Sequence, residues 1–220
     1  MVRCRRYDPL DRGEGIRNVL GTLGFLLCGA WFGTQLWLKQ LFSRRGREGL
    51  VPFAPLLAAC PPMLLLCWRG LYGPRGPALP QLWLWLLSGA TVLAVCGIRC
   101  LGGRKGRTVG RRELARLCAE AAMLEVAQRG MLQVFLMALL EAWGCRTVWC
   151  VVLNGLVWCG GILVQARLAR QSMGRELAWE LLSSLAFSLG CGYVFYRSGR
   201  LLFSAAAHAA ERFLVTKLDR

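Results

Sequence analysis

Several apolar stretches in this chain reach the roughly 18 to 20 residues that a helix needs to cross a bilayer. Hydrophobic residues make up 55% of the 220 positions and charged residues 18%, and the charges lie in clusters between the apolar stretches. A soluble domain of this length usually carries more charge and spreads it more evenly. The pattern therefore predicts a polytopic, all-α helical membrane protein.

We expect about five or six membrane segments followed by a C-terminal amphipathic helix. The expected segments are residues 18–42, 50–68, 80–98, 123–141, 147–165 and 177–196, with the amphipathic stretch at 199–220. The second segment contains four prolines, which argue against a straight helix. The chain then divides into a polar basic N-terminal segment (1–17), the first three membrane segments (18–98), a basic loop (99–116), and the remaining segments with the amphipathic stretch (117–220).

The distribution of Lys and Arg over the loops bears on topology through the positive-inside rule. If all six segments cross, the N-terminal side holds thirteen of these residues and the other side fourteen. If the third segment enters and returns on one side, the counts become seventeen and ten, and a re-entrant second segment gives fifteen and twelve. This bias favours one re-entrant segment and a cytoplasmic N-terminus, in the plasma membrane or an endomembrane.

The formal net charge of +16 raises the question of a nucleic-acid partner. Most of the basic residues, however, lie just outside apolar segments, where Lys and Arg meet lipid headgroups. We therefore expect no nucleic-acid partner, and we expect the basic loop 99–116 to contact the anionic headgroups of membrane lipids.

Conventional catalytic and metal-binding patterns are missing from the sequence. His208 is the single histidine, and its Ala-rich amphipathic surroundings are typical of a surface or helix-packing residue. The aspartates lie only in the terminal regions, and the sequence has no Walker A loop and no G-x-S-x-G motif. We expect no metal site, no cofactor and no enzymatic activity.

A polar stripe interrupts the apolar run 123–141. Glu125, Arg129 and Gln133 recur four residues apart, so they lie along one face of a helix. A charge at mid-bilayer costs from about 2.5 kcal/mol upward, so such side chains usually face a protein interior or a water-filled path. The stripe fits an interfacial helix, a structural bridge between helices, or a hydrophilic path for ions or lipid headgroups that Glu180 also joins.

Small and amide residues mark candidate helix-packing positions. Gly29 and Gly33 form a small-xxx-small pattern, which lets another helix approach closely. Asn154 and Gly155 interrupt the strongly apolar fifth segment. We expect these four residues to contribute to helix packing, although the glycine pair also fits a chance pairing in a glycine-rich chain.

The order of these features resembles the XK-related family of multipass membrane proteins, which includes phospholipid scramblases. The family's opening hairpin is similar to two runs of this chain, GTLGFLLCGAWFGTQLWLKQLF and the run ending LLLCWRGLYGPRG. The family's third segment resembles PQLWLWLLSGATVLAVCGIRCL. The stripe resembles an acidic family motif, with Glu125 at its first acid and Gln133 at the glutamine of its Pro-Gln pair. RSGRLLFSAAAHAA resembles a later family stretch that contains an arginine.

The chain departs from the family pattern at the stripe itself. Arg129 stands where the family has its second acid, Leu132 stands where it has proline, and the chain is about half the usual family length. The resemblance implies a scramblase-like protein that moves or contacts phospholipids along a polar helix face without ATP. The alternatives are a non-transporting assembly or adaptor protein that binds a single-span or multipass membrane partner, and a small channel.

Overall fold

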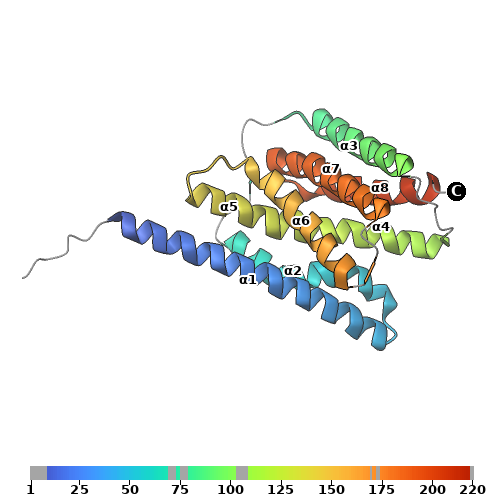
Figure 1. Cartoon of the computed structure of the whole chain (residues 1–220), viewed down its shortest axis with the longest axis horizontal. Coiled ribbons are helices and arrows are strands. Elements are labelled where there is room, and N and C mark those ends of the chain that lie inside the picture. The colour runs from blue at the N-terminus through green and yellow to red at the C-terminus, as the bar shows by residue number, and fades with distance from the viewer. Residues whose placement is uncertain are drawn as a thin grey trace, which may run out of the picture.

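The computed structural model describes residues 9–68, 73–74, 79–102, 109–168, 170–171 and 174–218. All regular structure within these ranges is helical (Figure 1). The elements are α1 (Pro9–Arg44), η1 (Glu48–Phe53), α2 (Ala54–Trp68), α3 (Gln81–Leu101), α4 (Arg111–Glu125), η2 (Val126–Gln133), α5 (Val134–Ala142), α6 (Trp149–Leu168), α7 (Arg175–Ser198) and α8 (Leu201–Leu218). The predicted all-α class is confirmed.

Within the described residues, four helical stretches are long and apolar enough to cross a membrane. They are Gln81–Leu101, Arg111–Ala142, Trp149–Leu168 and Arg175–Ser198. Large apolar side chains on their outer faces, such as Leu93 and Val164, are exposed, as expected where lipid rather than protein covers them. The chain is therefore a polytopic helical membrane protein, as its apolar stretches predicted.

Of the second and third apolar stretches, the second falls short of a crossing and the third does not. Helix α3 runs without interruption for 21 residues through the segment that the charge count favoured as re-entrant. Helix α2 has 15 residues and contains Pro61 and Pro62. At 1.5 Å per residue it is about 22 Å long, which is less than the roughly 30 Å hydrocarbon core.

The helices pack as a bundle in which α1 lies along one side and α3 along the opposite side (Figure 1). Helices α7 and α8 pack against α3, helix α4 packs against α8, and α6 packs against α7. The Ala-rich stretch predicted to be amphipathic forms α8, whose buried face includes Phe203, Ser204, Ala207, His208 and Glu211. Small side chains on this face let α8 lie close to α4.

The turn between α7 and α8 depends on a glycine. Gly199 has a φ of +64°, and its N–H donates to the carbonyl of Phe195 at 2.8 Å, which ends α7. A Cβ at this position would lie 2.8 Å from the backbone nitrogen of Pro74. Glycine satisfies both the left-handed conformation and the close approach of the two backbones.

The polar stripe lies in an unusual part of a continuous helical stretch. Residues Arg111–Ala142 form α4, η2 and α5 in succession, and η2 is a π-helix with a wider turn than an α-helix. Of its eight residues, Ala127–Gln133 are buried. π-helical turns occur frequently at functional sites because they displace side chains from the regular helical register.

The predicted basic loop 99–116 is shorter than expected. Helix α3 continues to Leu101 and α4 already begins at Arg111. Residues 103–108 of this loop lie outside the described residues, as does most of the turn between α2 and α3.

Candidate functional site

An ion pair is buried where α4 joins η2. Arg129 Nε donates to Glu125 Oε2 at 2.9 Å, and both side chains are fully buried. Removing two charges from water carries a large cost, which their mutual attraction and further hydrogen bonds must offset. Two residues of the predicted stripe thus form an i,i+4 ion pair in the interior of the protein.

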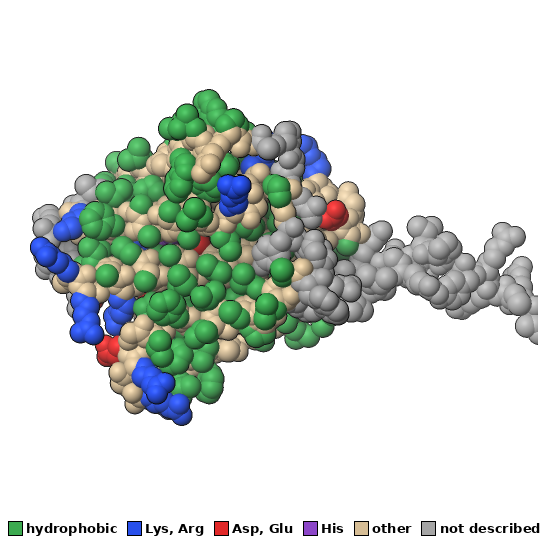
Figure 2. All heavy atoms as spheres, turned by 180° about the vertical axis from the view of Figure 1, so that it is seen from behind, with side chains coloured by type: hydrophobic (Ala, Val, Ile, Leu, Met, Phe, Trp, Pro, Cys, Tyr) green, Lys and Arg blue, Asp and Glu red, His purple; other side chains and the backbone are tan. Residues whose placement is uncertain are grey.

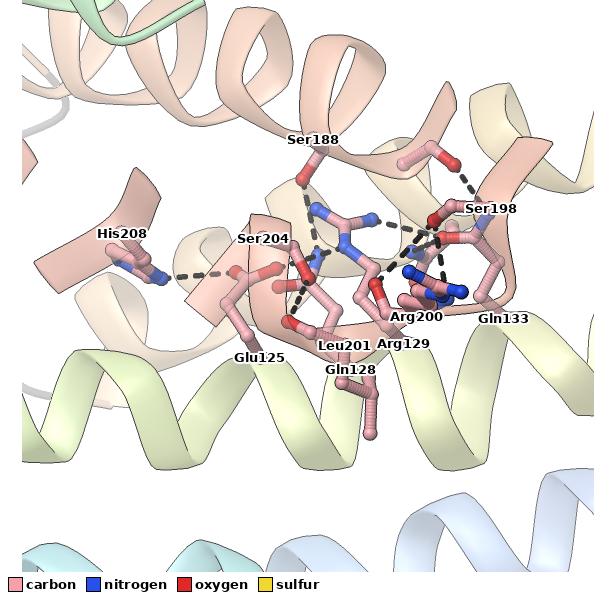
Figure 3. A network of polar contacts seen from close by, with 12 residues as sticks. Glu125, Gln128, Arg129, Gln133, Ser188, Ser198, Arg200, Leu201, Ser204 and His208 are labelled. Carbon is pink, nitrogen blue, oxygen red and sulfur yellow. Dashed lines mark hydrogen bonds and ion pairs between the residues drawn. The ribbon is translucent and has the colours of Figure 1, made fainter. Parts of the chain in front are cut away.

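The second oxygen of Glu125 faces the single histidine of the chain. His208 Nδ1 lies 2.9 Å from Glu125 Oε1, although the two residues are 83 positions apart (Figure 3). The carboxylate is paired with Arg129 and acts as an acceptor, so Nδ1 of His208 is the donor. The imidazole ring also packs against Phe187, with ring centroids 4.6 Å apart.

Amide groups surround the other end of Arg129. Arg129 Nη1 and Asn154 Nδ2 each donate to Gln133 Oε1 at 3.2 Å, and Gln133 Nε2 donates to the carbonyl of Gly192 at 2.8 Å. Gln128 Nε2 donates to the hydroxyl of Ser188 at 3.0 Å. The stripe of η2 is thus connected to α6 through Asn154 and to α7 through Ser188 and Gly192.

Two buried polar atoms of this network have no hydrogen-bond partner among the residues that the structure describes. They are Arg129 Nη2, a donor, and Asn154 Oδ1, an acceptor. Both belong to groups that contact Gln133 Oε1. Because an unsatisfied buried polar atom costs about 1–3 kcal/mol, each of the two adds to the cost of burying this network.

Gly192 permits the close packing of the network against α7. A Cβ on Gly192 would lie 3.1 Å from Arg129 Nη1 and 3.3 Å from Gln133 Oε1. These separations are tighter than ordinary van der Waals contact, so a larger residue would push the guanidinium and the amide away from α7.

The remaining residues singled out by sequence lie in different places. Gly155 packs against Leu185 and Ser188, next to Asn154 in the network. Glu180 lies near the start of α7 beside a small pocket with Arg99 and Trp179, away from Glu125. Gly29 and Gly33 are exposed on α1, and no atom lies within 4 Å of a Cβ built on either one.

An open apolar groove borders the polar network. It has a cavity volume of about 920 Å³ and lies between α1, α6 and the continuous η2–α5 stretch. Its apolar wall includes Trp31, Phe32, Met131, Leu132, Phe135, Leu136, Val157 and Trp158. Gln35 and Gln128 add polar groups, and Gln128 belongs to both the groove and the network.

The Glu125–His208 contact leaves one nitrogen of the imidazole ring free for proton transfer. With Nδ1–H donated to a carboxylate, the neutral imidazole has its lone pair on Nε2, which can accept a proton. A carboxylate that fixes the histidine tautomer in this way is the arrangement that makes histidine a general base in hydrolases. In the part of the chain that the structure describes, no group of three or more His, Cys, Asp and Glu residues could hold a metal ion.

Sequence reasoning missed His208 because nothing near it in the sequence indicates a partner. Its contact with Glu125 depends on how α8 packs against α4, and η2, α5, α6 and α7 lie between those two helices in the chain. The signal that was available is the Ala-rich face of α8, which predicts close approach of another helix.

Fold and network together define a polytopic helical membrane protein with a buried Glu–Arg–His cluster. Residues 114–214 match the family described as type II CAAX prenyl endopeptidase Rce1-like. The match covers less than half of the chain, and it contains Glu125, Arg129, Gln133, Asn154 and His208. The chain matches no curated protein and no solved structure.

This similarity corrects three expectations drawn from the sequence. The resemblance to the XK-related family is wrong, because the matched family is the Rce1-like one. The scramblase-like function and its adaptor and channel alternatives fall with it. The expectation of no enzymatic activity is also contradicted, because the matched family is one of endopeptidases. These errors arose from treating the stripe as an isolated helix face, without the histidine that packs against it.

Proposed function

We propose that this chain is a membrane-embedded endopeptidase that acts on prenylated proteins. The observation that carries the proposal is the 2.9 Å contact between His208 Nδ1 and the carboxylate of Glu125, which Arg129 holds from its other side. All three residues lie within the stretch that resembles the prenyl endopeptidase family.

In this proposal His208 is the general base for hydrolysis of a peptide bond. Nε2 takes a proton from a water molecule as the water oxygen attacks the scissile carbonyl carbon, and a tetrahedral oxyanion forms. The imidazolium then gives that proton to the leaving amide nitrogen as the C–N bond breaks. The products are a carboxylic acid and an amine, and the acid's proton passes to the amine to leave a carboxylate and an ammonium group. Glu125 stabilises the imidazolium between the two steps.

Arg129 has two roles in this scheme. Its Nε–H fixes the Glu125 carboxylate that orients His208. Its unpartnered Nη2 is a buried donor, of the kind that stabilises a developing oxyanion strongly in a site from which water is excluded. Electrostatic donors of this type commonly contribute about 10²- to 10³-fold to the turnover rate.

The apolar groove gives the prenyl chain a binding place. Its volume falls within the roughly 300–1,000 Å³ range of ligand pockets, and its wall is almost entirely aromatic and aliphatic. Gln128 lies both in the groove wall and in the network with Ser188. A lipid chain in the groove would therefore bring the attached peptide close to the polar cluster. The host membrane we expect is an endomembrane or the plasma membrane.

The test is cleavage of a fluorescent peptide that ends in a farnesylated Cys-aliphatic-aliphatic-X sequence, by purified protein in liposomes. We expect His208→Ala to lower the rate by at least about 100-fold, since general base catalysis is commonly worth 10²–10⁴. Ser204→Ala is the matched control. Ser204 lies one turn earlier on the same buried face of α8, and its hydroxyl donates to the carbonyl of Leu201 at 3.1 Å.

The proposal predicts that wild type and Ser204→Ala cleave the farnesylated peptide at similar rates and that His208→Ala cleaves it at least about 100-fold more slowly. It also predicts that the unprenylated peptide is a poor substrate. Equal cleavage by wild type and His208→Ala would exclude His208 as the base. No cleavage of any prenylated peptide by folded wild type would refute the proposed function itself.

A further inference from the structure

Basic side chains gather at one end of the helix bundle. Helices α1, α3, α6 and α8 finish at this end, and α4 and α7 begin there (Figure 1). Seen from behind, the Lys and Arg side chains gather mainly at the left end of the molecule, which is the same end (Figure 2). Ion pairs connect these helix ends: Arg99 pairs with Glu211 at 3.0 Å, and Lys39 pairs with Glu120.

Six exposed arginines at this end form what we call the basic rim: Arg44, Arg45, Arg47, Arg111, Arg112 and Arg170. Within the described part of the chain, none of the six has an acidic side chain within 4.0 Å. Several of the nearby acids face other bases: Glu48 faces Arg116, Glu120 faces Lys39, and Glu211 faces Arg99 and Arg212. The rim therefore carries positive charge that no acidic side chain of the described residues pairs with directly.

The rim lies where the apolar surface of the bundle ends. Leu101 and Leu168 are the last residues of α3 and α6, and they are 71% and 76% exposed. Apolar side chains exposed to this degree beside arginines are typical of the boundary between acyl chains and headgroups. A soluble polyanion would leave these leucines in water, whereas a membrane surface covers both kinds of residue.

We propose that the basic rim binds the headgroups of anionic phospholipids. The attraction combines the charge of several arginines with the negative surface potential of a leaflet that contains anionic lipid, and it is screened within a Debye length. This binding does not depend on the proposed peptidase activity, because none of the rim residues belongs to the polar network.

The proposal also orients the protein. Anionic lipids and the positive-inside rule both place the rim at the cytoplasmic leaflet. Helix α1 ends at the rim and begins at the other end of the bundle (Figure 1), so this orientation places its start at the end that faces away from the cytoplasmic leaflet. The expectation of a cytoplasmic N-terminus depended on a re-entrant stretch at 80–98, and α3 instead runs continuously through it.

The test is a thermal unfolding measurement on the full-length protein in detergent micelles. Phosphatidylglycerol and phosphatidylcholine are added separately, because a ligand that binds only the folded state raises Tm. We expect phosphatidylglycerol to raise Tm by several degrees more than phosphatidylcholine at low salt, and the difference to vanish at high salt. Glycerol phosphate, which has the headgroup charge without a lipid chain, should leave Tm unchanged.

Replacing the six rim arginines by glutamine should abolish the difference between the two lipids. The matched control replaces Arg146 and Arg200, at the opposite end, and should keep it. Equal Tm values for wild type in the two lipids would overturn the proposal, as would an equal shift from glycerol phosphate. Wild-type protein alone decides these outcomes, so the proposal stays falsifiable even if the sixfold variant does not fold.

Discussion

At the scale of residues, the buried pair Glu125–Arg129 differs from ion pairs on the surface of the same protein. Both of its side chains are fully buried, and they are joined by a 2.9 Å hydrogen bond. Removing one partner leaves an uncompensated buried charge, which typically costs about 3–5 kcal/mol. We expect Glu125→Gln and Arg129→Gln each to lower the free energy of unfolding by this amount, measured by denaturant unfolding in micelles.

The exposed pair Glu48–Arg116 provides the control for this prediction. Its atoms are 3.8 Å apart and the Glu48 side chain is 74% exposed, and a surface pair of this kind is worth about 0–1 kcal/mol. Glu48→Gln should therefore change stability little. If Glu125→Gln were as mild as Glu48→Gln, the buried pair would not be the strongly coupled unit described here.

Sequence alone identified one side of the Glu125–His208 contact. Glu125, Arg129 and Gln133 stood out because their spacing of four residues places them on one helix face in an apolar run. His208 did not, because a histidine among alanines has no local partner, and its contact with Glu125 spans 83 positions. Local periodicity determines the direction of a side chain around its helix, and tertiary packing determines what it meets.

At the scale of elements, the contact between η2 and α7 requires glycine at position 192. A Cβ there would press on Arg129 Nη1 at 3.1 Å and on Gln133 Oε1 at 3.3 Å. Overpacking of this kind costs about 1–3 kcal/mol, which outweighs the gain of up to about 1 kcal/mol from alanine in a helix. We expect Gly192→Ala to lower both the stability and the cleavage rate.

Gly160→Ala is the matched control on α6. No atom lies within 4 Å of a Cβ built on Gly160, so only the helix propensity changes, and stability should stay constant or rise. Unfolding curves and cleavage rates of the two variants, measured together, check the comparison. If Gly192→Ala behaved like Gly160→Ala, the packing of η2 on α7 would not constrain the site.

The helices themselves were largely predictable. The apolar stretches gave α2, α3, α6 and α7 with boundaries close to those observed, because length and hydropathy decide where a chain crosses a bilayer. The end of α1 was also close, but its start at Pro9 lies nine residues before the predicted one, within the segment 1–17 expected to precede it. The π-helical winding of η2 was not predictable, since it depends on how this stretch packs against its neighbours. The re-entrant third segment was predicted from a balance of loop charges and not from the segment itself, which is apolar enough to cross.

At the scale of the whole molecule, the groove between α1, α6 and the η2–α5 stretch is proposed to hold the prenyl chain. Gly161 lies in the groove wall, and no atom lies within 4 Å of a Cβ built on it. Gly161→Phe would place a ring in the groove without altering the network around Arg129. We expect KM for the farnesylated peptide to rise by about tenfold or more with kcat little changed, as for a loss of uniform binding.

Gly160→Phe is the control for the groove prediction. Gly160 is adjacent in sequence and also has no atom within 4 Å of a built Cβ, but it is not part of the groove wall. Steady-state kinetics of both variants should show the KM effect only for Gly161→Phe. The same KM for both variants would place the lipid chain elsewhere on the molecule.

The central claim is that the buried stripe and its histidine form a hydrolytic site. The most direct measurement compares the stability and peptide cleavage of wild type with those of Glu125→Leu/Arg129→Leu. Replacing both members of a buried ion pair by apolar residues recovers most of the stability lost by removing one. The account predicts a folded double variant that no longer cleaves the farnesylated peptide. Cleavage by that variant at the wild-type rate would contradict it, because the stripe would then be a structural bridge alone.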